Sequence, residues 1–170
     1  KTTGRCAVYW DANLETLHSA ALRELQLSRL RQTVARAAQS PFYGRRLQEA
    51  GVTAASLRRL SDIRRVPLTT KDDLRTYGLE MLTRPLADMV RLHASSGTTG
   101  QATVIYYTRA DIETWADLVA RSLYMTGMRP ADVFQNMMGY GLFTGGLGFH
   151  YGAERLGALT IPVGAGNSQR

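Results

Sequence analysis

The hydrophobic content of 44% in this 170-residue chain excludes wholesale disorder, and the length suits one domain or one large piece of a larger one. The net charge of +7, from 21 basic and 14 acidic residues, is compatible with a nucleic-acid surface, with solvated helix faces or with a charged small ligand. Because the arginines are spread over amphipathic segments and form no long run, we favour solvated helix faces and expect no nucleic-acid partner.

The cysteine and histidine content argues against disulfide and zinc chemistry. Cys6 is the single cysteine, so no internal disulfide forms and a cytoplasmic setting is predicted. The three scattered histidines do not make a Cys/His zinc site, and we predict no metal site within the chain. No stretch approaches the ~18 apolar residues of a membrane span, and the first residues lack the apolar run of a signal peptide, so we expect no membrane partner.

Residues 1–85 are predicted to form a mostly helical segment. Apolar residues at helical spacing predict a helix over 14–39, which Pro41 ends. A short helix over 42–50 is closed by Gly51, another helical turn is expected over 57–60, and Thr70 begins a helix that runs to about Tyr77. This segment shows no catalytic constellation.

Residues 86–170 have α/β character. Strands over 89–94 and 103–107 flank a polar loop, and Thr108 caps a helix that Gly127 ends. A strand over 133–138, a helix to about Leu156 and a strand over 159–163 have the spacing of a parallel strand–helix–strand unit. The predicted fold class is therefore α/β: a helical N-terminal segment followed by a partial, mostly parallel sheet with crossover helices, both within one domain.

The loop between the first two strands concentrates hydroxyl groups and glycines. Glycines let backbone N–H groups approach an anion closely, and hydroxyls add donors without charge. A Ser/Gly-rich turn without a ligand explains the same composition equally well. The candidate phosphate-binding residues are Ser95, Ser96, Gly97, Thr98, Thr99 and Gly100.

A second glycine-rich block runs from Gly139 to Gly148, after the next predicted strand. Ligands of open α/β sheets gather at loops beyond the carboxyl ends of strands, and both blocks occupy that place. Neither block has the spacing of a Walker loop or of a dinucleotide fingerprint.

Together the two blocks resemble a known family. The segment 95–100 looks like the phosphate-binding loop of the adenylate-forming acyl-CoA synthetases. The block Tyr-Gly-Leu-Phe-Thr-Gly-Gly, which starts at Tyr140, resembles the phenylacetate–coenzyme A ligases, as do His93-Ala94 and the stretch ending at Arg109. The resemblance runs from about Tyr9 to Arg170 and so covers nearly the whole chain.

The resemblance implies an ATP-dependent ligase. Such an enzyme converts an aryl carboxylate to an acyl-adenylate and then passes the acyl group to coenzyme A. It implies that the loop at 95–100 holds the ATP phosphates while Mg²⁺ shares their charge, and that catalysis is mainly positioning and charge stabilisation. The residues implied to border the aryl-acid pocket are Tyr140, Phe143, Gly145 and Gly146. We assign no chemistry to His150, since a buried histidine bonded to backbone is an equal alternative.

Two departures from the family pattern bear on activity. Gln101-Ala102 stands where the family loop commonly carries lysine and proline, and a lysine adds positive charge beside a triphosphate. The family's acidic Mg²⁺ residue, ribose-binding aspartate and C-terminal lysine have no counterpart here. We therefore expect an N-terminal portion that is inactive alone and is completed in cis or by another chain. The alternative is a non-catalytic nucleotide-binding or oligomerisation module. An open sheet edge near Leu159 predicts a homo-oligomer.

Overall fold

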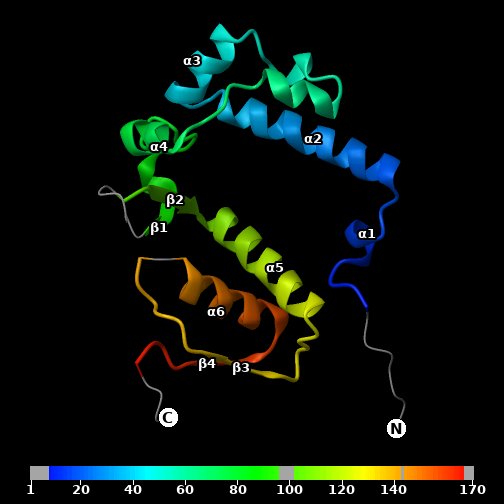
Figure 1. Ribbon diagram of the computed structural model, residues 1–170, viewed down its shortest axis with the longest axis vertical. Helices are drawn as coiled ribbons and strands as arrows, with labels where there is room; N and C mark the ends of the chain where they lie inside the picture. The colour runs from blue at the N-terminus through cyan, green and yellow to red at the C-terminus, as the bar shows by residue number, and fades with distance from the viewer. Residues whose placement is uncertain (1–7, 96–101, 143, 167–170) are drawn as a thin grey trace. The chain divides into compact units, whose positions relative to one another are not determined.

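The computed structural model describes residues 8–95, 102–142 and 144–166 (Figure 1). The chain divides into two compact units. We call residues 17–90 and 102–106 the helical unit, and residues 8–16, 91–95, 107–142 and 144–166 the α/β unit.

The helical unit is built around one long helix. Its helices are α2 (Ser19–Ala37), α3 (Pro41–Glu49) and α4 (Lys71–Tyr77) (Figure 1). The 3₁₀ turns η1 (Ala54–Ser56) and η2 (Leu60–Arg65) lie between α3 and α4, and η3 (Leu86–Asp88) follows α4. The buried core consists of Val34, Leu47, Val52 and Leu57. As predicted, Gly51 follows α3 with a φ of 62°, a left-handed conformation that glycine adopts without strain.

Two helix predictions in this part of the chain were wrong in their bounds. The long helix does not begin at Leu14, because the short α1 (Ala12–Glu15) ends at Thr16 and His18 caps a new helix. The Nδ1 atom of His18 accepts the Ala21 N–H at 3.1 Å. The helical turn expected over 57–60 is replaced by η1 and η2 on either side of buried Leu57, and η2 forms because the Asp62 carboxylate accepts the Arg58 N–H at 2.7 Å.

In the α/β unit, strands β3 (Val133–Asn136) and β4 (Leu159–Pro162) pair in parallel, with Val133 opposite Leu159. Helix α6 (Gly145–Leu156) is the crossover between them, so the predicted strand–helix–strand unit is confirmed. It ends at Gly157, whose φ is 93°. Helix α5 (Arg109–Met125) begins, as predicted, at a capping box between Thr108 and Asp111 and lies along α6 (Figure 1).

The strands β1 (Met89–Ala94) and β2 (Val104–Thr108) form a separate two-stranded sheet. The described strands therefore make two small sheets, where the sequence indicated one partial sheet. The α/β class and the mixture of strands with crossover helices are as predicted.

Close contact between α5 and α6 depends on two glycines. A Cβ atom on Gly152 would lie 2.3 Å from Cγ1 of Val119, and one on Gly148 would lie 2.6 Å from the Trp115 ring. The core beside this contact contains Ala120, Leu123, Tyr124, Ala153, Leu156 and Ala158. Trp10 packs on that core and its indole N–H donates to Asp117 at 3.3 Å, which holds the N-terminal aromatic ring against α5.

In the described part of the chain, no helix combines the length and the apolar character needed to cross a membrane.

Candidate functional site

The end of β1 contacts the segment that follows β3. The backbone N–H of Ala94 donates to the carbonyl oxygen of Leu142 at 3.1 Å, and Nδ1 of His93 lies 2.9 Å from the same oxygen. Ser95, the first residue of the candidate phosphate loop, directly follows this contact. The strand end that leads into the first glycine-rich block thus contacts the second block at Leu142. Ser96, Gly97, Thr98, Thr99 and Gly100 lie outside the described residues.

Tyr140 is held by a buried asparagine at the end of β3. Asn136 is 1% exposed, and its Nδ2 donates to Oη of Tyr140 at 2.8 Å and to the carbonyl of Gly146 at 2.7 Å. Its Oδ1 accepts the Met138 N–H at 3.2 Å. The Asn136 side-chain amide therefore connects the backbone at Met138 to Tyr140 and to the first turn of α6.

The hydroxyl of Tyr140 also contacts His150, at 3.2 Å from Nδ1. Nε2 of His150 lies 3.0 Å from a carboxylate oxygen of Glu154. Because the carboxylate only accepts, the proton on Nε2 faces Glu154, and Nδ1 is free to accept from the tyrosine. The series of side-chain contacts from Asn136 through Tyr140 and His150 to Glu154 fixes the direction of the Tyr140 phenol. His150 therefore contacts side chains and orients Tyr140, and is not bonded to a backbone group of the described residues as the alternative had it.

The predicted pocket glycines have different surroundings. Gly146 is buried, and a Cβ atom there would lie 2.3 Å from the carbonyl oxygen of Gly139. The space beside Gly146 is therefore occupied by backbone. Gly145 begins α6 and is half-buried, whereas Phe143 lies outside the described residues.

The His93 imidazole, which makes the contact at the end of β1, packs against two other aromatic rings. The imidazole of His93 is 2% exposed and meets Tyr107 and Trp115 edge-on, with ring centroids 5.5 and 5.4 Å away. Those two rings stack on each other at 5.8 Å. Burial raises the pKa of the Tyr107 phenol, and the negative charge of Asp111 adds to the effect.

Sequence reasoning did not identify the orienting residues Asn136 and His93. The only available signal was their place: each is a polar residue at or next to the end of a strand. The described residues contain no group of three or more His, Cys, Asp or Glu side chains arranged to hold a metal ion.

Comparison with known proteins tests the resemblance found in the sequence. No family model matches the chain. It is 48% identical over 159 residues to the phenylacetate–coenzyme A ligase of Escherichia coli (strain K12), covering 92% of this chain and 36% of that protein. It is 47% identical over 163 residues to the enzyme of the same name from Thermus thermophilus, covering 95% of this chain and 37% of that protein. The resemblance to the phenylacetate–coenzyme A ligases is confirmed.

Solved structures agree with this family likeness. A 2-hydroxyisobutyryl-CoA ligase in an open conformation, in complex with 2-HIB-AMP and CoA, matches with a TM-score of 0.87 and 32% identity, over 97% of this chain and 40% of that one. The same ligase in the thioesterification state matches with a TM-score of 0.87 and 34% identity, over 95% of this chain and 36% of that one. The α/β fold of an acyl-CoA ligase N-terminal part, predicted from the sequence, is thus confirmed. The chain spans little more than a third of the curated relatives it matches.

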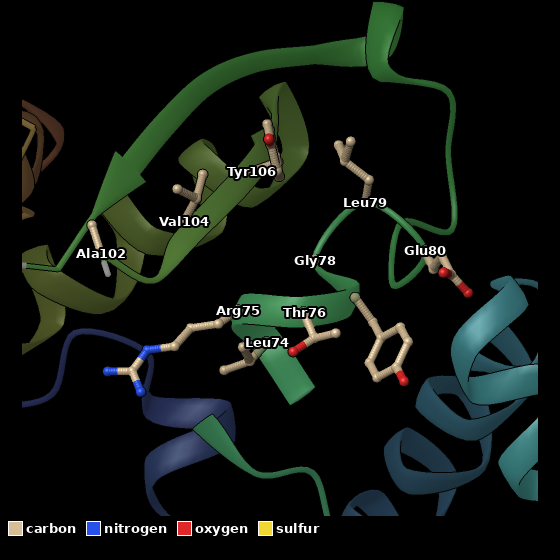
Figure 2. Close-up of a pocket in the computed structure, with 10 residues that line it drawn as sticks. Leu74, Arg75, Thr76, Gly78, Leu79, Glu80, Ala102, Val104 and Tyr106 are labelled. Atoms are coloured by element: carbon tan, nitrogen blue, oxygen red, sulfur yellow. The ribbon is translucent and has the colours of Figure 1, made fainter. Parts of the chain in front are cut away.

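Two cavities lie in the described part of the helical unit. One, of about 420 Å³, lies between strand β2 and the second half of α4 with the residues that follow it, as Figure 2 shows, and Leu79, Val104 and Tyr106 are among its walls. The other, of about 330 Å³, lies between α2, α3 and η2 and is lined mainly by apolar side chains, including Leu47 and Val66.

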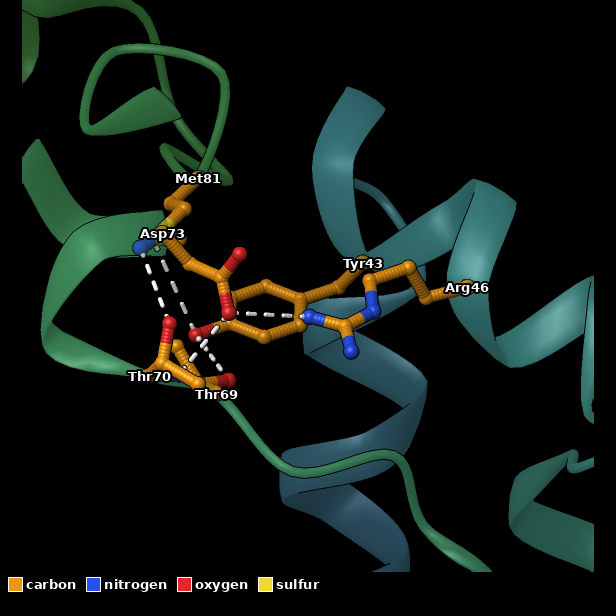
Figure 3. Close-up of polar contacts among 6 residues, drawn as sticks. All are labelled: Tyr43, Arg46, Thr69, Thr70, Asp73 and Met81. Atoms are coloured by element: carbon orange, nitrogen blue, oxygen red, sulfur yellow. Dashed lines mark hydrogen bonds and ion pairs between the residues drawn. The ribbon is translucent and has the colours of Figure 1, made fainter. Parts of the chain in front are cut away.

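A polar junction stabilises the start of α4 beside the second cavity (Figure 3). Asp73 accepts the Thr70 N–H at 2.8 Å and contacts the Arg46 guanidinium at 3.2 Å. The hydrogen bonds from Thr70, with the Arg46 charge, hold the pKa of the Asp73 carboxyl below its usual value. This is the capping box predicted from the sequence, with a charge partner from α3 that the sequence did not reveal.

Proposed function

We propose that the protein containing this chain is an ATP-dependent aryl-acid–coenzyme A ligase acting on a phenylacetate-like acid. A carboxylate oxygen of the acid attacks the α-phosphorus of ATP, and pyrophosphate leaves. The sulfur of coenzyme A then attacks the acyl carbon, and AMP leaves as the thioester forms. The observation that carries this proposal is the 48% identity to a phenylacetate–coenzyme A ligase through 92% of the chain.

We assign phosphate binding to the loop 95–100 and the border of the acid pocket to Tyr140, Phe143, Gly145 and Gly146. The contact between β1 and Leu142 supports this assignment, because it brings Ser95 and the Tyr140 segment to one place. Near that place the acid carboxylate and the phosphates have to meet for adenylation. Because the Gly139 carbonyl occupies the space beside Gly146, we propose that the acid binds on the other side of the Tyr140 segment.

Mg²⁺ is implied by the family likeness, but no carboxylate cluster among the described residues fits it. We therefore assign no described residue of this chain to the binding of Mg²⁺. We propose that residues 1–85 and 86–170 are two parts of one N-terminal domain, and that the remaining groups come from further sequence in cis or from another chain.

The cytoplasmic setting and the homo-oligomer stay predictions. The exposed side chains of Leu159 and Ile161, at 65% and 42%, support an interaction at β4. Light scattering of the 170-residue chain over a range of concentrations tests the oligomer, and a monodisperse monomer contradicts it.

Acid-dependent exchange of radiolabelled pyrophosphate into ATP by the whole protein tests the ligase proposal. We expect exchange with phenylacetate and little with short aliphatic acids. Absence of exchange with every arylacetate tried contradicts the proposal, and titration calorimetry then separates a non-catalytic ATP-binding module from a chain that binds neither substrate.

A further inference from the structure

We propose that His93 is a positioning residue that sets the place of the acid-pocket segment relative to the end of β1, from which Ser95 leads into the proposed phosphate loop. This inference rests on the proposed ligase function, because it assigns a role within the same site. His93 does not touch a substrate in this account. It acts through the carbonyl oxygen of Leu142.

The geometry at Leu142 is a double hydrogen bond from consecutive residues of β1. Nδ1 of His93 and the backbone N–H of Ala94 reach the same oxygen, at 2.9 and 3.1 Å. A carbonyl oxygen only accepts, so the imidazole proton is on Nδ1. Nε2 is buried and makes no hydrogen bond to any described residue. The imidazole therefore has one polar partner there, and that partner belongs to the other block.

Packing against Tyr107 and Trp115 restricts rotation of the imidazole away from Leu142. The imidazole is 2% exposed between the rings of Tyr107 and Trp115. Trp115 in turn abuts α6 at Gly148, where a Cβ atom would lie 2.6 Å from the indole ring. The imidazole side of this hydrogen bond is buried although the Leu142 residue is 64% exposed, and a hydrogen bond shielded from water in this way is stronger than one in water.

The segment that carries Tyr140 is thereby held at two points. Asn136 binds the hydroxyl of Tyr140 at 2.8 Å from the β3 side, and His93 binds Leu142, two residues further on, from the β1 side. Ala94 shares the second point and directly precedes Ser95. The shared carbonyl thus fixes the Tyr140 segment against the end of β1 that leads into Ser95, and a misplacement of about 1 Å between reacting groups costs about a hundredfold in rate.

The test uses His93→Asn and His93→Gln in the whole protein. The side-chain amide of asparagine places its nitrogen near the position of Nδ1, so it can donate to Leu142. Glutamine carries the same amide one methylene further out and cannot make that bond in the same geometry. We expect the KM for phenylacetate in the pyrophosphate-exchange assay to rise about tenfold in His93→Gln and to stay within about twofold of wild type in His93→Asn, as the loss of one part-buried hydrogen bond predicts. The control is His18→Asn, which keeps the cap of α2 and leaves the KM unchanged.

The KM readout separates positioning from a general effect on folding, because KM does not depend on the fraction of folded enzyme. Hydrogen exchange of a peptide covering 137–142 supplies a readout that needs no activity. We expect faster exchange in His93→Gln and wild-type exchange in His93→Asn.

The inference is overturned if the two variants behave alike in both assays, or if His93→Gln matches wild type in both. If the wild-type protein shows no pyrophosphate exchange, the proposed function fails. The hydrogen-exchange comparison then still decides whether His93 holds the segment.

Discussion

Replacing Gly152 with alanine should push α5 and α6 apart. The added Cβ would lie 2.3 Å from Cγ1 and 2.6 Å from Cβ of Val119, and 3.2 Å from the backbone nitrogen of Ala120. Val119 has essentially one favoured side-chain rotamer in a helix, so its side chain cannot turn away. The backbone nitrogen of Ala120 can move only with its helix. The strain has to be relieved by movement of a helix.

The size of the effect follows from two opposing terms. Overpacking a close contact costs about 1–3 kcal/mol, and these distances favour the upper end. Replacing glycine by alanine within a helix gains about 1 kcal/mol. We therefore expect the free energy of unfolding to fall by about 2 kcal/mol, which lowers the urea midpoint by about 1 M for a slope of about 2 kcal/mol per M.

Urea unfolding of Gly152→Ala against two controls checks this reasoning. Gly141→Ala, at a position with open space around the new Cβ, should be neutral or slightly stabilising. Gly152→Ala combined with Val119→Ala should be less destabilised than the two single changes added together, because Cγ1 of Val119 is the nearest atom. A stabilised Gly152→Ala variant would refute the close helix contact.

Three further predictions concern other elements. Asn136→Ala removes three hydrogen bonds of a buried side chain and should lower the free energy of unfolding by about 2–4 kcal/mol; a loss below about 1 kcal/mol in urea unfolding would contradict its anchoring role. The hydrogen bonds from Thr70 and the Arg46 charge hold the pKa of the Asp73 carboxyl below its usual value of 3.8 in the folded chain, so its stabilising effect, present at neutral pH, is lost as the pH falls below about 4 through the folded pKa. Asp73→Asn should therefore flatten the acid side of the stability profile, and an unchanged profile would count against it. Trp10→Phe keeps the ring contact with Tyr124 but loses the donor to Asp117, so thermal unfolding should show a loss of about 0.5–1.5 kcal/mol; no change would mean that this contact contributes little.

Local signals in the sequence predicted most of the fold. Thr70 and Thr108, each with a carboxylate three residues later, marked helix starts that the structure has. Gly157 marked the end of α6, and the spacing of strands around it indicated the parallel pair. These features depend on residues within a few positions of one another, which is why a single sequence reveals them.

The arrangement of the candidate site was less accessible, because its contacts join distant residues. His93 and Leu142 are 49 positions apart, and Asn136 and Gly146 are 10 apart. The glycines show the limit most clearly. The sequence implies that Gly146 borders the acid pocket, and the structure adds that the carbonyl of Gly139 lies where a Cβ of residue 146 would be. A glycine pattern alone does not distinguish space for a ligand from close approach of two backbones.

The central proposal is that this chain is part of a ligase that activates an aryl acid through its adenylate. Its most direct test is mass-spectrometric product analysis of the whole protein incubated with ATP, phenylacetate and coenzyme A. We predict phenylacetyl-coenzyme A and AMP in equal amounts, and phenylacetyl-AMP when coenzyme A is left out. Formation of ADP and phosphate, or of no acyl product with any arylacetate, would contradict the claim.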